Sequence, residues 1–130
     1  MRHLSRLLTL VFLLTIASQI SSAPYSVGEI VDHLDRILPF QYTDPNVGRV
    51  TILDASGIEP STVIVRYRMD DRSRGPFSRS ELADWRDHAV RQHCAGTDGM
   101  IEFNKEWVQR WVDKNNRHVG DIRYSNEDCI

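Results

Sequence analysis

The chain has 130 residues, of which 26% are charged, and its formal net charge is −2. This length suits one domain with a modest hydrophobic core, and no repeat, low-complexity stretch or long linker indicates a second domain. A mildly acidic chain lacks the basic surface that nucleic-acid binding requires. We therefore expect a single small domain that does not bind nucleic acid.

The first 23 residues have the layout of a secretory signal peptide. A basic start precedes an apolar run over Leu7–Ala17 and small residues up to Ala23, and the run is short for a membrane span. Cleavage after Ala23 would leave Pro24 next to the cut, which disfavours that site. Cleavage after Ala17, or retention of the segment as a membrane anchor, is the alternative. We predict a signal peptide over residues 1–23 and one domain over residues 24–130, and membrane contact only if the segment is retained.

The first element of the predicted domain is a helix. Ser26 is a good N-cap residue, and apolar residues recur at helical spacing over Val27–Leu38. Pro39 ends the helix, because the residue before a proline is displaced from helical geometry.

A loop and a β-hairpin are predicted next. Phe40–Gly48 is interpreted as a loop, and Arg49–Ala55 and Thr62–Met69 are two β-branched runs around a turn. Alternation of apolar and arginine residues in the second run fits a sheet with one covered and one solvated face. Residues 70–77 are predicted to be a polar loop.

The second helix has the clearest start signal in the chain. Ser78 and Glu81 have capping-box spacing, in which each side chain accepts from the other residue's backbone N–H. The helix is predicted to run to Cys94, with an apolar stripe toward the core: Leu82, Trp85 and Ala89.

A second hairpin follows. Glu106–Asp113 places Trp107, Gln109 and Trp111 on one face of a strand, although its spacing also fits an amphipathic helix. The turn-forming residues 114–117 and a second strand over His118–Tyr124 favour the hairpin. The predicted fold class is α+β, helix–hairpin–helix–hairpin, with two helices on one face of a four-stranded, mainly antiparallel sheet.

Cys94 and Cys129 are the two cysteines of the chain. In an exported protein such a pair predicts one disulfide, and a redox-active pair would need Cys-x-x-Cys spacing. Closing this loop is expected to stabilise the domain by roughly 3–4 kcal/mol. Two free thiols are the alternative.

The stretch from Asp113 to Cys129 resembles the C-terminal end of a loose group of small, largely uncharacterised periplasmic proteins of Gram-negative bacteria. Chains of that group close with a cysteine-bearing helix, an aromatic β-hairpin and a terminal Asp-Cys pair, here Asp128-Cys129. Asn115-Asn116 stands where the group has a glycine-containing turn, and Trp stands where its first strand more usually has Tyr. The resemblance covers about the last third of the chain. It implies the fold and the disulfide, and it implies no catalytic residue.

Catalytic and metal motifs are absent from the sequence. The five histidines include no His-x-x-x-His pair, and no Gly-x-Ser-x-Gly elbow or phosphate-binding glycine loop occurs. We therefore predict no metal, no cofactor and no catalytic residue, and interpret the histidines as exposed or half-buried. A triad assembled only in three dimensions remains open.

Two sets of residues are candidates for partner binding. An arginine cluster could bind a partner's carboxylates or phosphates, unless Asp70 and Asp71 neutralise it locally. Two tryptophans on one strand face are more typical of core, but exposed they would anchor a partner. The candidate residues are Arg66, Arg68, Arg72, Arg74, Arg79, Trp107 and Trp111.

Two classes of function fit this chain. The first is a non-catalytic periplasmic or secreted protein that acts through a binding surface, as an accessory, inhibitor or immunity-type factor. Its expected partner is another protein, an acidic one if the arginine cluster is the docking surface. The alternative is a small enzyme or ligand-binding cup with a pocket between sheet and helices, which would require convergent polar groups inside the pocket.

Overall fold

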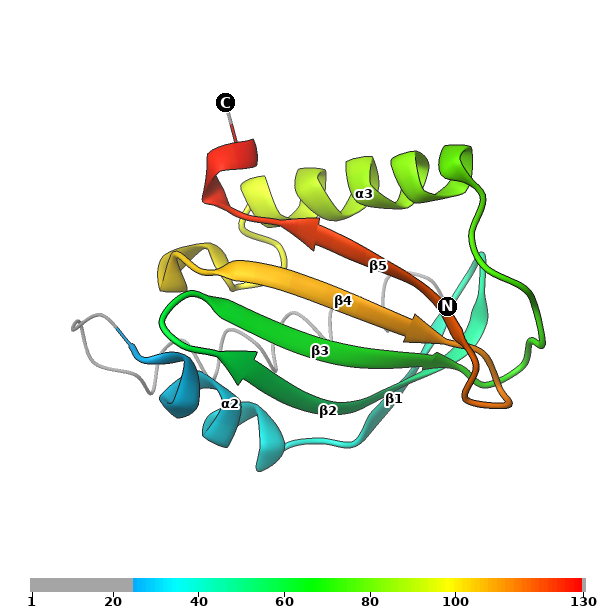
Figure 1. Ribbon diagram of the computed structural model, residues 1–130, viewed down its shortest axis with the longest axis horizontal. Helices are drawn as coiled ribbons and strands as arrows, with labels where there is room; N and C mark the ends of the chain where they lie inside the picture. The colour runs from blue at the N-terminus through cyan, green and yellow to red at the C-terminus, as the bar shows by residue number, and fades with distance from the viewer. Residues whose placement is uncertain (1–24, 130) are drawn as a thin grey trace.

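The computed structural model describes residues 25–129 (Figure 1). The predicted signal peptide lies outside the described residues. Two α-helices, five strands and two short 3-10 helices follow in chain order: α2 (Val27–Asp35), β1 (Phe40–Asp44), β2 (Gly48–Ile58), β3 (Thr62–Met69), α3 (Arg79–Cys94), η1 (Ile101–Phe103), β4 (Glu106–Val112), β5 (His118–Tyr124) and η2 (Asn126–Asp128). Within the described part of the chain, neither α-helix is both long and apolar enough to cross a membrane.

The strands form one mixed sheet in the order β1-β2-β3-β4-β5 (Figure 1). β1, β2 and β3 form an antiparallel meander, and β4 pairs antiparallel with β5. Between them β3 and β4 run parallel, because the chain crosses over through α3 before it re-enters the sheet. The α+β class is confirmed, while the sheet has five strands instead of the expected four.

The additional strand is β1, which the sequence analysis interpreted as loop. Its aromatic side chains Phe40 and Tyr42 alternate with polar ones and pair with Ile52 and Val50 of β2. An edge strand of five residues with one neighbour depends on that neighbour for its conformation, because strand preference reflects packing more than local propensity. The local sequence therefore gave a weak signal.

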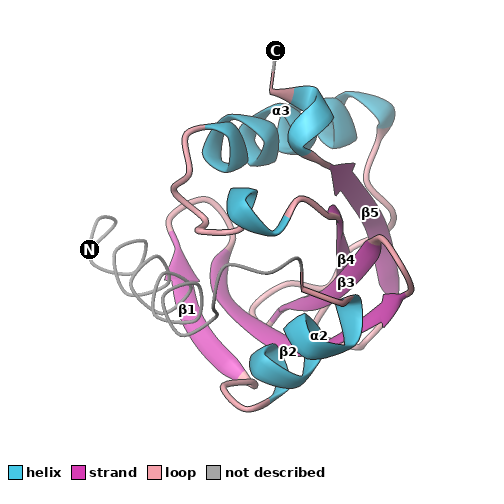
Figure 2. Ribbon diagram, turned by 90° about the vertical axis from the view of Figure 1, so that its left-hand side faces the viewer, coloured by secondary structure: helices cyan, strands magenta, loops and turns pink. Residues whose placement is uncertain are grey.

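Both helices pack on the same face of the sheet. A methyl group added at Gly57 of β2 would overlap the Val27 side chain of α2, and one added at Gly120 of β5 would overlap Phe77, just before α3. These glycines lie on one face by register, since Gly57 pairs with Val63, Val63 with Trp107, and Trp111 with Gly120. The expected one-sided arrangement is confirmed (Figure 2).

The helix starts were predicted well. Ser26 caps α2 by accepting from the backbone N–H of Glu29, and the Ser78–Glu81 capping box is complete at the start of α3. α2 ends at Asp35, three residues before the predicted end at Leu38. After Asp35 the backbone forms one further turn before Pro39, in which the Leu34 carbonyl accepts from the N–H groups of Ile37 and Leu38.

Cys94, the last residue of α3, forms a disulfide with Cys129, which confirms the predicted pair. The Cα atoms lie 5.2 Å apart, and the bond closes a loop with a sequence separation of 35. No free cysteine remains. The bond anchors the end of the chain beside the C-terminus of α3.

Candidate functional site

A cavity of about 840 Å³ lies on the helix-bearing face of the sheet. The end of α2 and strand β1 form one wall, α3 forms the opposite wall, and β3, β4 and the end of β5 form the floor. We call this cavity the cup. Its lining is mostly apolar and aromatic, and includes Leu34, Ile37, Leu38, Phe40, Tyr42, Ile52, Val65, Tyr67, Trp85, Ala89, Met100, Trp107, Gln109, Trp111 and Tyr124.

Aromatic rings organise the deep end of the cup. Tyr67 and Trp111 are neighbours in the parallel β3–β4 pair, and their rings stack with centroids 4.8 Å apart and planes 19° apart. Trp85 of α3 meets Trp111 edge-on, with centroids 4.9 Å apart, and Phe77 packs on Trp85 at 4.8 Å. Such contacts hold flat apolar surfaces in place.

A chain of polar groups crosses the floor. The indole Nε1 of Trp111 donates to the side-chain oxygen of Gln109 over 3.1 Å, and the Gln109 amide nitrogen donates to the Tyr124 hydroxyl over 3.2 Å. An indole N–H can only donate, so Trp111 fixes which end of the amide faces Tyr124. Gln109 is thus a polar residue with a set orientation between two tryptophans.

The two floor tyrosines remain protonated. Burial raises the pKa of Tyr67 above its ordinary value, and the negative charge of Asp98 adds to this effect. Burial likewise raises the pKa of Tyr124, with Tyr67 and Asp98 as further contributors. Both hydroxyls therefore act as neutral hydrogen-bonding groups.

Asp98, at the edge of the cup, belongs to a buried cluster with His93. The fully buried His93 ring contacts Asp98 through Nδ1 at 3.0 Å and Asn126 through Nε2 at 2.7 Å. Burial by itself lowers the pKa of His93, but the hydrogen bond and charge of Asp98 outweigh it, so the pKa is raised. The expectation of exposed or half-buried histidines is wrong for this residue, because Asp98, five residues on, and Asn126, 33 residues on, satisfy its ring.

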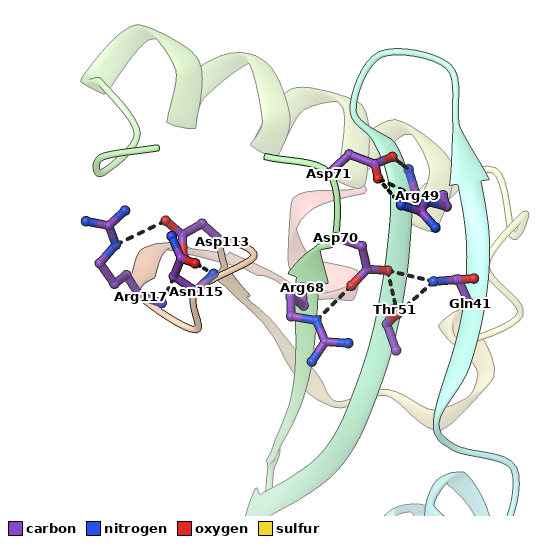
Figure 3. A network of polar contacts seen from close by, with 9 residues as sticks. All are labelled: Gln41, Arg49, Thr51, Arg68, Asp70, Asp71, Asp113, Asn115 and Arg117. Atoms are coloured by element: carbon purple, nitrogen blue, oxygen red, sulfur yellow. Dashed lines mark hydrogen bonds and ion pairs between the residues drawn. The ribbon is translucent and has the colours of Figure 1, made fainter. Parts of the chain in front are cut away.

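The arginine cluster is largely paired within the protein. Arg66 binds Asp54 at 2.5 Å, Arg68 binds Asp70 at 2.7 Å, and Arg74 binds Glu81 at 2.8 Å. The Asp70 carboxylate also accepts from Thr51 and Gln41 (Figure 3).

Two members of the cluster form no ion pair with a carboxylate among the described residues. Arg72 donates to the backbone carbonyl of Asn46 at 2.8 Å, and Arg79 makes no ion pair within this part of the chain. Arg66 and Arg68 alternate with the cup-lining residues of β3, so they lie on the opposite face of the sheet. Docking of an acidic partner on this cluster stays a prediction.

Trp107 and Trp111 are buried, with exposed fractions of 3% and 4%, which confirms the core interpretation. Both line the cup from within. They cannot act as exposed anchors for a partner in this conformation.

Asp113 is a buried residue that the sequence analysis did not single out. Its carboxylate accepts from the backbone N–H groups of Asn115 and Arg117 and from the Arg117 guanidinium (Figure 3). It also accepts from the backbone N–H of Arg74. Burial opposes its ionisation, but these donors and the Arg117 charge outweigh burial, so the pKa of Asp113 is lowered. Asp113 fixes the β4–β5 turn and ties it to the loop before α3. In the sequence, an aspartate directly after a strand and two residues before an Asn was the available signal that its side chain fixes a turn.

No group of three or more His, Cys, Asp and Glu side chains is placed to hold a metal within residues 25–129. At the cup, the structure brings together the polar groups of the floor chain and the His93–Asp98 pair. The sequence pattern Trp-x-Gln-x-Trp on one strand face was the signal for the floor chain, because it places an amide on an otherwise apolar face.

No protein-family model and no curated protein matches this chain. Among solved structures, the fold is similar to the crystal structure of PA3611 from Pseudomonas aeruginosa, a protein whose description as secreted is itself provisional. The similarity covers 80% of this chain and 89% of that one, with a TM-score of 0.56 and 13% sequence identity. At this identity the similarity shows a common fold.

Proposed function

We propose that this chain is an exported, non-catalytic protein that binds a small, mainly apolar ligand in the cup. The observation that carries the proposal is the cavity of about 840 Å³, walled by aromatic residues and floored by an oriented polar chain. Ligand pockets typically span about 300–1,000 Å³ and combine apolar lining with a few placed polar groups. The convergent polar groups that a ligand-binding cup requires are therefore at hand.

Two observations favour a ligand in the cup over a partner docked on the surface. Three cluster arginines already bind carboxylates of the same chain, so their charges are partly compensated before any partner arrives. The two tryptophans are buried and line the cup.

Export rests on three supports. The N-terminal sequence has the layout of a signal peptide, and the domain contains a disulfide, which persists in oxidising compartments. A protein of similar fold is provisionally described as secreted.

Binding can be measured with N-phenyl-1-naphthylamine, a neutral apolar fluorophore, titrated against the mature protein. We expect saturable one-to-one binding with quenching of tryptophan fluorescence, because Trp85 and Trp111 line the cup. Ala89→Phe, which extends a buried cup-lining side chain, should weaken binding roughly tenfold or more. Ala83→Phe, at an exposed position of the same helix outside the cup, is the matched control and should bind like wild type.

Near-UV circular dichroism verifies that both variants are folded. Absence of saturable binding to wild type would refute the proposal. Equal binding by folded Ala89→Phe would show that the fluorophore binds elsewhere, and would refute it as well.

A further inference from the structure

Three hydrogen-bond donors of the cup lack an acceptor among residues 25–129. Trp107 is 3% exposed, and its indole Nε1 is buried without a partner. The Tyr124 hydroxyl, on a side chain 7% exposed, accepts from Gln109, and its own proton finds no acceptor. The Tyr67 hydroxyl makes no hydrogen bond to a described residue. A buried donor without an acceptor destabilises a protein by about 1–3 kcal/mol, so the unpartnered Trp107 indole N–H, with two tyrosine protons near it in the same cavity, requires an explanation.

The three donors lie on the same floor. Trp107 and Tyr124 are directly opposite each other in the antiparallel β4–β5 pair. Tyr67 belongs to the adjacent strand β3, where its ring stacks on Trp111 of β4. All three residues line the cup.

The charge around these donors disfavours an anion. Asp98 lines the cup and acts on both tyrosine hydroxyls by opposing a negative charge there. The same field and the same burial would oppose a ligand carboxylate placed at the floor. Arg91 of α3 also lines the cup, but its side chain is exposed, so it does not offset Asp98 at the floor.

Resting on the proposed function, we infer that the cup selects neutral ligands in which an apolar body carries a hydrogen-bond acceptor such as a ketone, ester or amide carbonyl. The acceptor takes hydrogen bonds from the Trp107 indole N–H and from a tyrosine hydroxyl of the floor, and the apolar body packs against the aromatic walls. Anionic ligands of the same shape, such as carboxylates, are excluded by burial and by Asp98.

Three naphthalenes of similar size test this selectivity at pH 7.5: 2-acetylnaphthalene with a neutral carbonyl, 2-ethylnaphthalene without a polar group, and 2-naphthoate as an anion. Affinities are measured by calorimetry or tryptophan quenching. We expect the ketone to bind roughly tenfold more tightly than the naphthoate and about fivefold more tightly than the hydrocarbon, as one or two net hydrogen bonds would give.

The double variant Tyr67→Phe/Tyr124→Phe should reduce the preference for the ketone over the hydrocarbon, because only the Trp107 donor remains, while its affinity for the hydrocarbon stays within about twofold of wild type. Tyr25→Phe is the matched control, since it removes a buried hydroxyl outside the cup, and it should keep the preference.

The outcomes separate this inference from the function it rests on. If the hydrocarbon binds in the cup but the ketone has no advantage, or the naphthoate binds as tightly, the inference is overturned and the binding function stands. A ketone preference in the double variant as large as in wild type overturns it too. If none of the three naphthalenes binds wild type, both the inference and the proposed function fail.

Discussion

Removal of the Cys94–Cys129 disulfide by Cys94→Ser/Cys129→Ser is expected to lower the free energy of unfolding by about 4 kcal/mol. This value follows from the sequence separation of 35, because a cross-link reduces the entropy of the unfolded chain by an amount that rises with the logarithm of the loop length. Domains of this size have total stabilities of about 5–15 kcal/mol. The disulfide is thus expected to supply a large share of the domain's total stability.

The folded variant should keep its structure, because other contacts hold the C-terminal segment. The Asn126 side chain contacts His93 at 2.7 Å and donates to the Ile101 carbonyl at 2.8 Å, and Asp128 binds Arg86 at 2.7 Å. The loss should therefore arise mainly in the unfolded state, which becomes more expanded and gives a steeper dependence on urea.

Urea unfolding followed by tryptophan fluorescence measures both quantities. Wild type with reductant should converge on the variant, and reductant should leave the variant unchanged. A loss below about 1 kcal/mol with an unchanged urea slope would refute the entropic argument.

Three further predictions concern packing and pH. Gly57→Ala should destabilise by about 2 kcal/mol in urea unfolding, because the added methyl overlaps Val27, whereas Gly75→Ala, with open space around it, should change stability by less than about 0.5 kcal/mol. Folding lowers the pKa of Asp113, so its ionised carboxylate stabilises the folded protein. This stabilisation is present above about pH 4 and is lost as the pH falls through the pKa of Asp113 in the folded state. Asp113→Asn should flatten the acid limb of a plot of melting temperature against pH, and an unchanged limb would contradict this assignment. Folding raises the pKa of His93, so the stability that its protonation supplies is present below about pH 6.5 and is lost as the pH rises through its pKa in the folded state. His93→Gln should remove this decline in melting temperature with rising pH. A decline of the same size in the variant would contradict the assignment to His93.

The sequence predicted those elements whose signals are local. The capping box at Ser78 and Glu81 lies within one turn, and the start of α3 was placed within a residue of the observed one. The final hairpin was equally predictable, since its two strands adjoin a turn in which Asn116 takes the left-handed conformation at φ 63°. Cys94 and Cys129 could be paired because no other cysteine competes.

Features that depend on distant partners were missed. β1 is a strand only because β2 lies beside it, and the parallel pairing of β3 with β4 joins segments separated by a helix. The cup needs side chains from both helices and all five strands, so no local pattern outlines it. Burial of His93 likewise depends on Asn126, 33 residues further along the chain.

The parallel β3–β4 pair divides the fold into two pieces that are each continuous in sequence. One piece contains α2 and the meander β1–β3, and the other contains α3, β4 and β5. The disulfide lies wholly within the second piece, so oxidation can complete that piece without joining it to the first. The cup spans the seam, with Tyr67 on one side and Trp111 on the other. A bound ligand would therefore contact both pieces and stabilise their association. The two pieces produced as separate chains should reassemble more readily in its presence.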